Sequence, residues 1–138
     1  MISFHAENNF VLDSKEDVRE WISLVIDTRG FAEGEVSYVF CDDAFLLELN
    51  KKYLDHDTLT DIISFDYSLG SELHGEIYIS TERVEENAAT YEVSFVDELH
   101  RVLIHGILHY MGLKDKSETE EKAMRRAEDE ALAMRSFV

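Results

Sequence analysis

Two histidines stand four residues apart in a segment that is otherwise almost entirely apolar, and this combination restricts the fold more than any other feature of the sequence. A helix is predicted from Val96 to Met111, and the apolar part of it runs from Val102 to Met111 and contains His105 and His109. A helix that is apolar nearly all round is buried, and a spacing of four places both imidazoles on one face, about one turn apart. Buried imidazoles need polar partners. We therefore expect a central helix whose two histidines share one partner.

The residues after this helix supply a third candidate ligand. Gly112 can end the helix in a left-handed turn, and Asp115, six residues after His109, could then reach the same ion. An isolated His-x-x-x-His pair is more often two core histidines, but the added glycine and carboxylate favour a metal site. Three protein ligands leave a fourth position open, as in catalytic zinc sites. The sequence thus predicts one ion held by His105, His109 and Asp115, with Zn²⁺ the first choice and iron, nickel or manganese also suitable.

Short strands alternate with helices along the rest of the chain. Strands are predicted at Ile2–Phe4, Val36–Phe40, Ile62–Phe65 and Ile77–Ile79. Besides the central helix, four helices are predicted to begin near Asp13 or Ser14, Asp42 or Asp43, Ser80 or Thr81, and at the capping box of Ser117. There is no repeat, linker or low-complexity tract. This pattern predicts a single α+β domain over residues 1–138, with a mixed sheet of about four strands and about five helices.

Charge and composition restrict the partners. The chain has 30 acidic and 13 basic residues, a net charge of −17, which taken alone argues against nucleic-acid binding. A local basic patch, the metal ion or a basic protein partner could offset it. No stretch approaches the ~20 apolar residues of a membrane span, and there is no signal-peptide pattern. The single cysteine, Cys41, fits a reducing compartment, so we expect a cytoplasmic protein with no membrane partner.

The histidine pair resembles the extended metal motif of zincin peptidases, which predicts a zincin-like metal helix. Those enzymes carry glutamate directly after the first histidine as the general base. Here that position is Gly106, which has no side chain to take a proton. A metallopeptidase is therefore the less favoured alternative.

At the same residues the chain resembles the YbeY-type rRNA maturation factors, metal-dependent endoribonucleases that act on single-stranded RNA. The family pattern His-Gly-x-Leu-His-x-x-Gly matches residues 105–112, and two upstream stretches, 49–65 and 75–80, also match. The resemblance spans roughly Leu49 to Leu132. It implies a nuclease that matures the 3′ end of small-subunit rRNA, with precursor rRNA, the small ribosomal subunit and its proteins as partners, and no DNA substrate.

Three positions depart from this family pattern. Asp115 replaces the usual third histidine, Leu54 stands where an arginine is usual, and Leu59 stands where proline precedes Thr-Asp. Aspartate is an acceptable zinc ligand, so the first change would keep the metal site but alter the chemical properties of the bound ion. The loss of an arginine would remove a phosphate contact. A metal-stabilised ribosome-assembly factor without cleavage activity therefore remains an alternative.

No other catalytic residue is assigned from the sequence, and the nucleophile and general base stay open. Asp61 and Glu76 could orient a ligand or a water, or could be ordinary carboxylates, and His74 could reach a phosphate or be merely exposed. Lys114 and Lys116 could add local positive charge beside Asp115, or act only as solubilising residues. We assign no role to His5, His56 and His100. The basic and acidic residues of the last helix are interleaved, which favours a charge-paired helix face over an RNA-binding track; they are Glu120, Glu121, Lys122, Arg125, Arg126 and Glu128.

Overall fold

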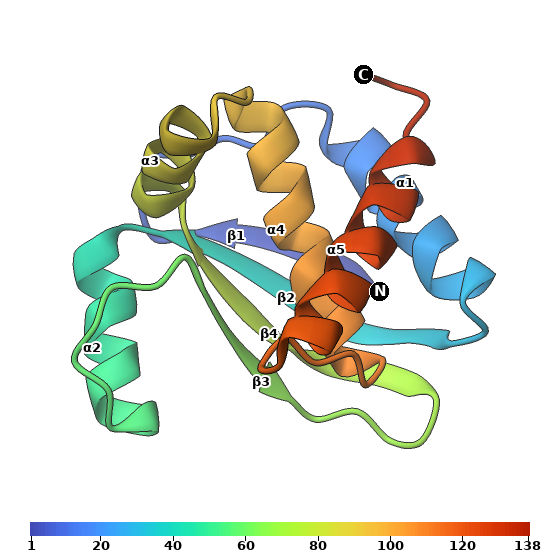
Figure 1. Cartoon of the computed structure of the whole chain (residues 1–138), viewed down its shortest axis with the longest axis horizontal. Coiled ribbons are helices and arrows are strands. Elements are labelled where there is room, and N and C mark those ends of the chain that lie inside the picture. The colour runs from blue at the N-terminus through green and yellow to red at the C-terminus, as the bar shows by residue number, and fades with distance from the viewer.

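The computed structural model describes residues 1–138 as one mixed β-sheet packed with five helices (Figure 1). The elements in chain order are β1 (Ile2–Ala6), α1 (Lys15–Thr28), β2 (Ala32–Cys41), α2 (Asp43–Leu54), β3 (Ile62–Asp66), β4 (Glu72–Ser80), α3 (Thr81–Tyr91), α4 (Phe95–Tyr110) and α5 (Glu118–Ala133). This arrangement confirms the predicted α+β class, the four strands and the five helices. No helix combines the length and the hydropathy that a membrane span would need.

The sheet has the strand order β1-β2-β4-β3. β1 pairs with β2 and β2 with β4 in parallel, while β3 runs antiparallel to β4 at the edge. β2 and β4 begin earlier than the sequence pattern predicted, at Ala32 and Glu72, where they pair with each other. The sequence pattern did not predict the first residues of β2, because they include polar residues such as Glu33 and Glu35. These residues can still pair as a strand, since a ladder of backbone hydrogen bonds does not require apolar side chains.

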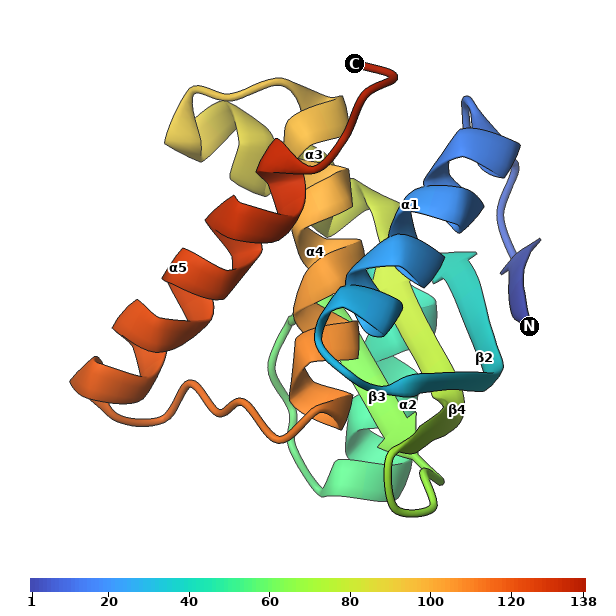
Figure 2. The ribbon, with the colours of Figure 1, turned by 90° about the vertical axis from the view of Figure 1, so that its right-hand side faces the viewer.

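The two faces of the sheet carry different cores, because successive side chains of a strand point to opposite sides. Ile77 and Ile79 of β4 belong to the large buried cluster that also contains the apolar residues of α1 and α4. Tyr78, between them, packs instead with the small cluster beneath α2. Figure 2 accordingly shows α2 on the side of the sheet opposite α1 and α4. The predicted apolar stripe of α1 is fully buried: Val18, Trp21, Ile22, Val25 and Ile26.

Tyrosine hydroxyls join α4 to the sheet at the middle of the helix and at its C-terminal end. Tyr38 of β2 donates to the carbonyl of Leu103 at 2.8 Å. At the C-terminal end, the Tyr110 hydroxyl lies within hydrogen-bond distance of the carbonyl oxygens of Phe65 (2.9 Å) and Glu76 (3.2 Å). The ring of Tyr110 crosses Gly75, where an added Cβ would collide with it. The helix that carries both histidines is therefore held in a fixed position over β3 and β4.

Candidate metal centre

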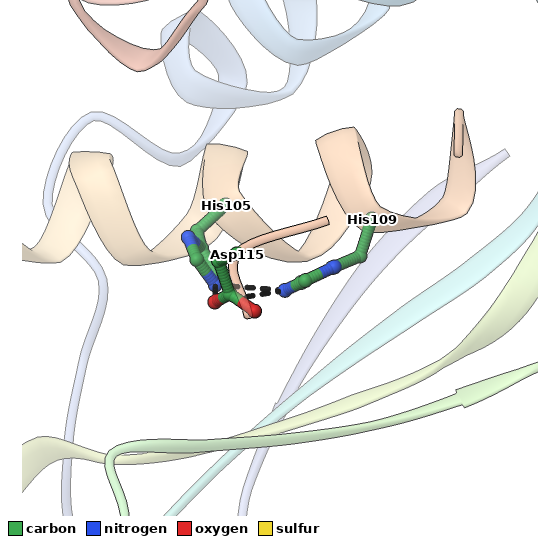
Figure 3. Close-up of side chains that lie close together, drawn as sticks. All are labelled: His105, His109 and Asp115. Atoms are coloured by element: carbon green, nitrogen blue, oxygen red, sulfur yellow. Dashed lines mark hydrogen bonds and ion pairs between the residues drawn. The ribbon is translucent and has the colours of Figure 1, made fainter. Parts of the chain in front are cut away.

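His105, His109 and Asp115 converge on one point, as Figure 3 shows. α4 supplies the two histidines, and the chain reverses at Gly112, which has a positive φ of 97°. The Nε2 atom of His105 lies 2.9 Å from Nε2 of His109 and 3.2 Å from Oδ2 of Asp115. The Nε2 atom of His109 lies 3.4 Å from the same oxygen. The structure thus brings together the three residues that the sequence singled out.

These separations fit the coordination shell of a small ion. Ligands at 2.0–2.1 Å around a tetrahedral zinc are roughly 3.3–3.4 Å apart. The two distances to the carboxylate agree with that value, and the distance between the imidazoles is slightly shorter. All three donor atoms lie within 4.8 Å of one another, so one ion can contact every one of them.

The other ring nitrogen of each histidine is already engaged, which fixes the tautomers. Nδ1 of His109 donates to the carbonyl of Leu113 at 2.9 Å, and Nδ1 of His105 donates to Oε2 of Glu128 at 2.6 Å. With hydrogen on Nδ1, each neutral ring presents a lone pair at Nε2. Two lone pairs and a carboxylate that face one another repel unless a cation lies between them. The donor set therefore fits a divalent transition metal.

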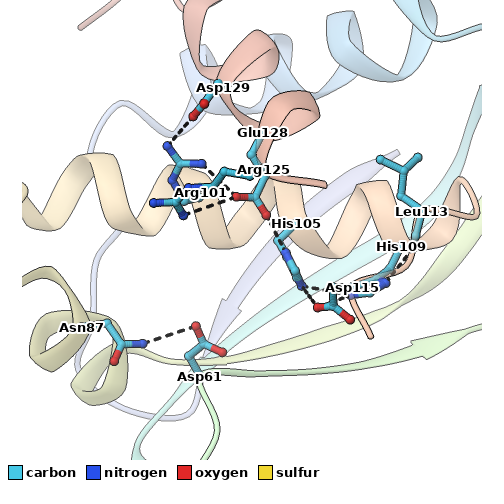
Figure 4. Close-up of polar contacts among 10 residues, drawn as sticks. All are labelled: Asp61, Asn87, Arg101, His105, His109, Leu113, Asp115, Arg125, Glu128 and Asp129. Carbon is cyan, nitrogen blue, oxygen red and sulfur yellow. Dashed lines mark hydrogen bonds and ion pairs between the residues drawn. The ribbon is translucent and has the colours of Figure 1, made fainter. Parts of the chain in front are cut away.

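Glu128 of α5 is the residue of this centre that the sequence interpretation missed. Its side chain is only 5% exposed and accepts a hydrogen bond from Arg101 at 2.8 Å, while Arg101 also binds Asp129 at 2.7 Å (Figure 4). Glu128 is thus charge-paired, as the sequence interpretation expected of this helix face, but it is buried and its partners include His105. The available signal was its spacing: Glu128 follows Met124 by four residues and precedes Ala131 by three, on the buried face of the helix.

Glu128 also controls the protonation of the ligand that it holds. Burial alone would lower the pKa of His105, but the hydrogen bond to Glu128 and the negative charges of Glu128, Asp115 and Asp61 together raise that pKa. The hydrogen bond keeps one proton on Nδ1 and turns Nε2 toward Asp115, and a divalent cation at this point would displace any proton on Nε2.

A cleft of about 270 Å³ opens beside His105 and Asp115. α3, α4, α5 and the start of β3 line it, and His105, Asp115 and Glu128 form part of its wall. Asp61 faces the same cleft, where burial raises the pKa of its carboxyl group. Asn87 of α3 donates a long hydrogen bond to Asp61 at 3.5 Å, as Figure 4 shows. Of the two carboxylates that the sequence offered as additional site residues, Asp61 and Glu76, Asp61 is the one that lines this cleft.

Other candidates lie elsewhere or have other partners. Nδ1 of His74 accepts a hydrogen bond from the backbone N–H of Glu35 at 3.0 Å, and its Nε2 contacts Glu72, so it joins β2 to β4. Glu76 lies in a separate hollow near Tyr67.

Lys114 and Lys116 are exposed, Leu54 is an exposed residue at the end of α2, and His100 is a buried core histidine.

Gly106 stands where zincin peptidases carry their general base, and the structure leaves little room for a side chain there. A Cβ at this position would lie 3.0 Å from Ile77 and 3.2 Å from Ile62, because this side of α4 packs against the sheet. A glutamate after His105 would point into the core and away from the ligands. The position cannot supply a general base.

Comparison with known proteins matches residues 2–136 to the family model described as "Endoribonuclease YbeY". The chain belongs to the YbeY family. A YbeY relative from Flavobacterium psychrophilum, named "Endoribonuclease YbeY", is 56% identical over 97% of this chain and 96% of its own length. The relative of the same name from Porphyromonas gingivalis is 47% identical over 96% and 89% of the two chains. The solution structure of TM1509 from Thermotoga maritima has a TM-score of 0.70 at 28% identity and covers 97% of this YbeY chain and 88% of that one.

Proposed function

We propose that this protein is a metal-dependent endoribonuclease that cleaves single-stranded RNA, with His105, His109 and Asp115 as the metal ligands. The observation that carries the proposal is the convergence of three ligand atoms whose histidines are both fixed through Nδ1. The names of the YbeY relatives support the reaction class.

The residues of the centre have separate tasks. A divalent ion, for which we propose zinc, supplies a Lewis acid for a phosphoryl oxygen and activates water. His105, His109 and Asp115 hold it, and Glu128 orients His105. Asp61, half-buried in the same cleft, has a carboxyl group whose raised pKa suits it to hold or pass a proton. Gly106 takes no part, because it faces the sheet.

The biological setting follows from the family. We propose that residues 1–138 act as one catalytic domain in the cytoplasm, in the maturation of the 3′ end of small-subunit rRNA. The partners would be precursor rRNA, the small ribosomal subunit and its proteins. The net charge of −17 favours recruitment by a basic ribosomal protein over unaided attraction to RNA.

The same charge supports one alternative, a ribosome-assembly factor that keeps the metal for stability and does not cleave. The test is to offer the zinc-loaded protein single-stranded RNA, duplex RNA and casein, with the Asp115→Ala variant as control. We expect cleavage of the single-stranded RNA only, lost in the variant. Binding of RNA without cleavage would establish the alternative, and cleavage of casein would indicate a peptidase.

A further inference from the structure

The cleft beside the metal centre has one side chain on each wall that is suited to a nucleotide. In Figure 1, α4 lies between α3 and α5, and α4 contributes the residues between the two walls. Asn87 and Tyr91 are four apart on α3, so they share one face of that helix. Arg125 and Glu128 are three apart on α5 and line the opposite wall. A single RNA strand that approached the metal ligands through this cleft would pass between Tyr91 on one wall and Arg125 on the other.

Arg125 is the arginine of this cleft that can accept an anion. Arg101 is 19% exposed and binds two carboxylates, Glu128 at 2.8 Å and Asp129 at 2.7 Å. Arg125 is 61% exposed, and its only ion pair, with Glu128, is long at 3.9 Å. Its guanidinium therefore has N–H donors left for a phosphate, which it can bind in a bidentate manner.

The carboxylates of the cleft leave this role open. Glu128 is satisfied by Arg101 and His105. Asp115 contacts the Nε2 atoms of His105 and His109, and Asp61 accepts a hydrogen bond from Asn87. Neither of these carboxylates forms an ion pair with Arg125. Because the net charge of −17 repels polyanions, the positive charge of Arg125 should contribute a large share of the attraction between this cleft and RNA.

Tyr91 supplies a surface for a base. It is the last residue of α3, it is 57% exposed, and its ring makes no contact with another aromatic ring. Exposed aromatic rings stack on any base, but only on one that has left its duplex. A base held in this way would restrict the site to single strands.

We propose that this cleft is a nucleotide subsite next to the metal centre, in which Arg125 binds a phosphate and Tyr91 stacks on the base of a single-stranded RNA. This proposal rests on the proposed function, because it names how the RNA strand is held. Asn87, one turn before Tyr91, lies where its amide could contact the edge of the same base.

The first test measures binding of a short, fluorescein-labelled 2′-O-methyl RNA to the zinc-loaded protein at several salt concentrations. Arg125→Ala should weaken binding about tenfold, and its plot of log K against log salt should be shallower by about 0.7, the loss of one phosphate contact. Arg126→Ala is the matched control, because Arg126 is an exposed neighbour outside the cleft. Equal losses in both variants, or a loss of bound zinc in Arg125→Ala, would overturn the phosphate contact.

The second test addresses the base. Tyr91→Ala should weaken binding of the same probe about tenfold with the salt slope unchanged, because stacking releases no counterions. Tyr91→Phe keeps the ring and should stay within about twofold of the wild type. Equal affinity of the wild type and Tyr91→Ala would refute stacking. If the wild type cleaves RNA and all variants bind the probe as tightly as the wild type, the subsite proposal is wrong and the proposed function stands. If the wild type neither binds nor cleaves RNA, both the subsite proposal and the proposed function are wrong.

Discussion

Glu128 of α5 accepts a hydrogen bond from Nδ1 of His105 of α4 at 2.6 Å, although the two residues are 23 positions apart. This contact makes the last helix part of the candidate metal centre. Arg101, one turn before His105 on α4, binds the second oxygen of Glu128 and so holds the carboxylate in place. The ligand geometry therefore depends on the packing of α5 against α4 as well as on the motif itself.

Replacement of Glu128 by glutamine should weaken metal binding by about 10–100-fold, the usual cost of losing the partner of a ligating histidine. The amide retains the size of the side chain but not the charge that favours the Nδ1 proton of His105. Competition with a chelating dye measures the affinity. Glu121→Gln, at an exposed position of α5, is the control and should bind metal like the wild type.

A second prediction concerns Gly75, beneath the ring of Tyr110. Gly75→Ala should destabilise the fold by about 1–3 kcal/mol or more, because the new methyl group displaces Tyr110 and breaks its contacts with Phe65 and Glu76. Gly70→Ala provides the comparison, since a Cβ there meets no neighbour and only the positive φ of 60° opposes it. Urea denaturation of both variants should give the larger loss at Gly75. Equal losses would mean that Tyr110 and the backbone carbonyl of Phe65, which the new methyl group would also meet, both move aside without cost.

Acid stability should depend on His100, which is buried against Trp21 and Phe137. Burial and the nearby charge of Arg135 lower the pKa of His100 from 6.5 to about 4, while Asp97 acts in the opposite direction. Below pH 6.5 the unfolded chain therefore binds a proton that the folded protein resists. The contribution of His100 is complete above pH 6.5 and is lost as the pH falls to about 4, by at most about 3 kcal/mol.

The variant His100→Gln keeps an acceptor for Arg135 but does not titrate. In excess chelator, which removes any effect of metal release, its unfolding free energy should fall less steeply than that of the wild type between pH 6.5 and 4. Parallel curves for the two proteins would contradict the lowered pKa of His100.

The sequence predicted the central helix, the convergence of His105, His109 and Asp115, and all four strands, because each depends on local spacing. Residues four apart on a helix share a face whatever the rest of the chain does, so His105 and His109 could be paired from the sequence alone. The glycine at position 112 made the return of Asp115 a reasonable expectation, and the structure shows the turn.

Glu128 could not be predicted by the same reasoning. A glutamate among arginines on a helix is normally solvated, and only the packing of α5 against α4 places this one beside His105. The cleft likewise requires three helices and β3 to meet, so Tyr91 and Arg125 gave no sign of sharing a site. What the sequence did not predict was therefore tertiary contact between residues distant along the chain.

The central claim is that one ion held by His105, His109 and Asp115 is required for RNA cleavage, and a titration of activity with zinc tests it most directly. Metal-free protein would receive increasing zinc, with the rate of cleavage of a labelled single-stranded RNA measured at each step. The rate should be negligible without zinc, rise to a plateau at one equivalent in the wild type, and stay flat in Asp115→Ala. Full activity in the metal-free wild type, or the same titration curve in the variant, would contradict the claim.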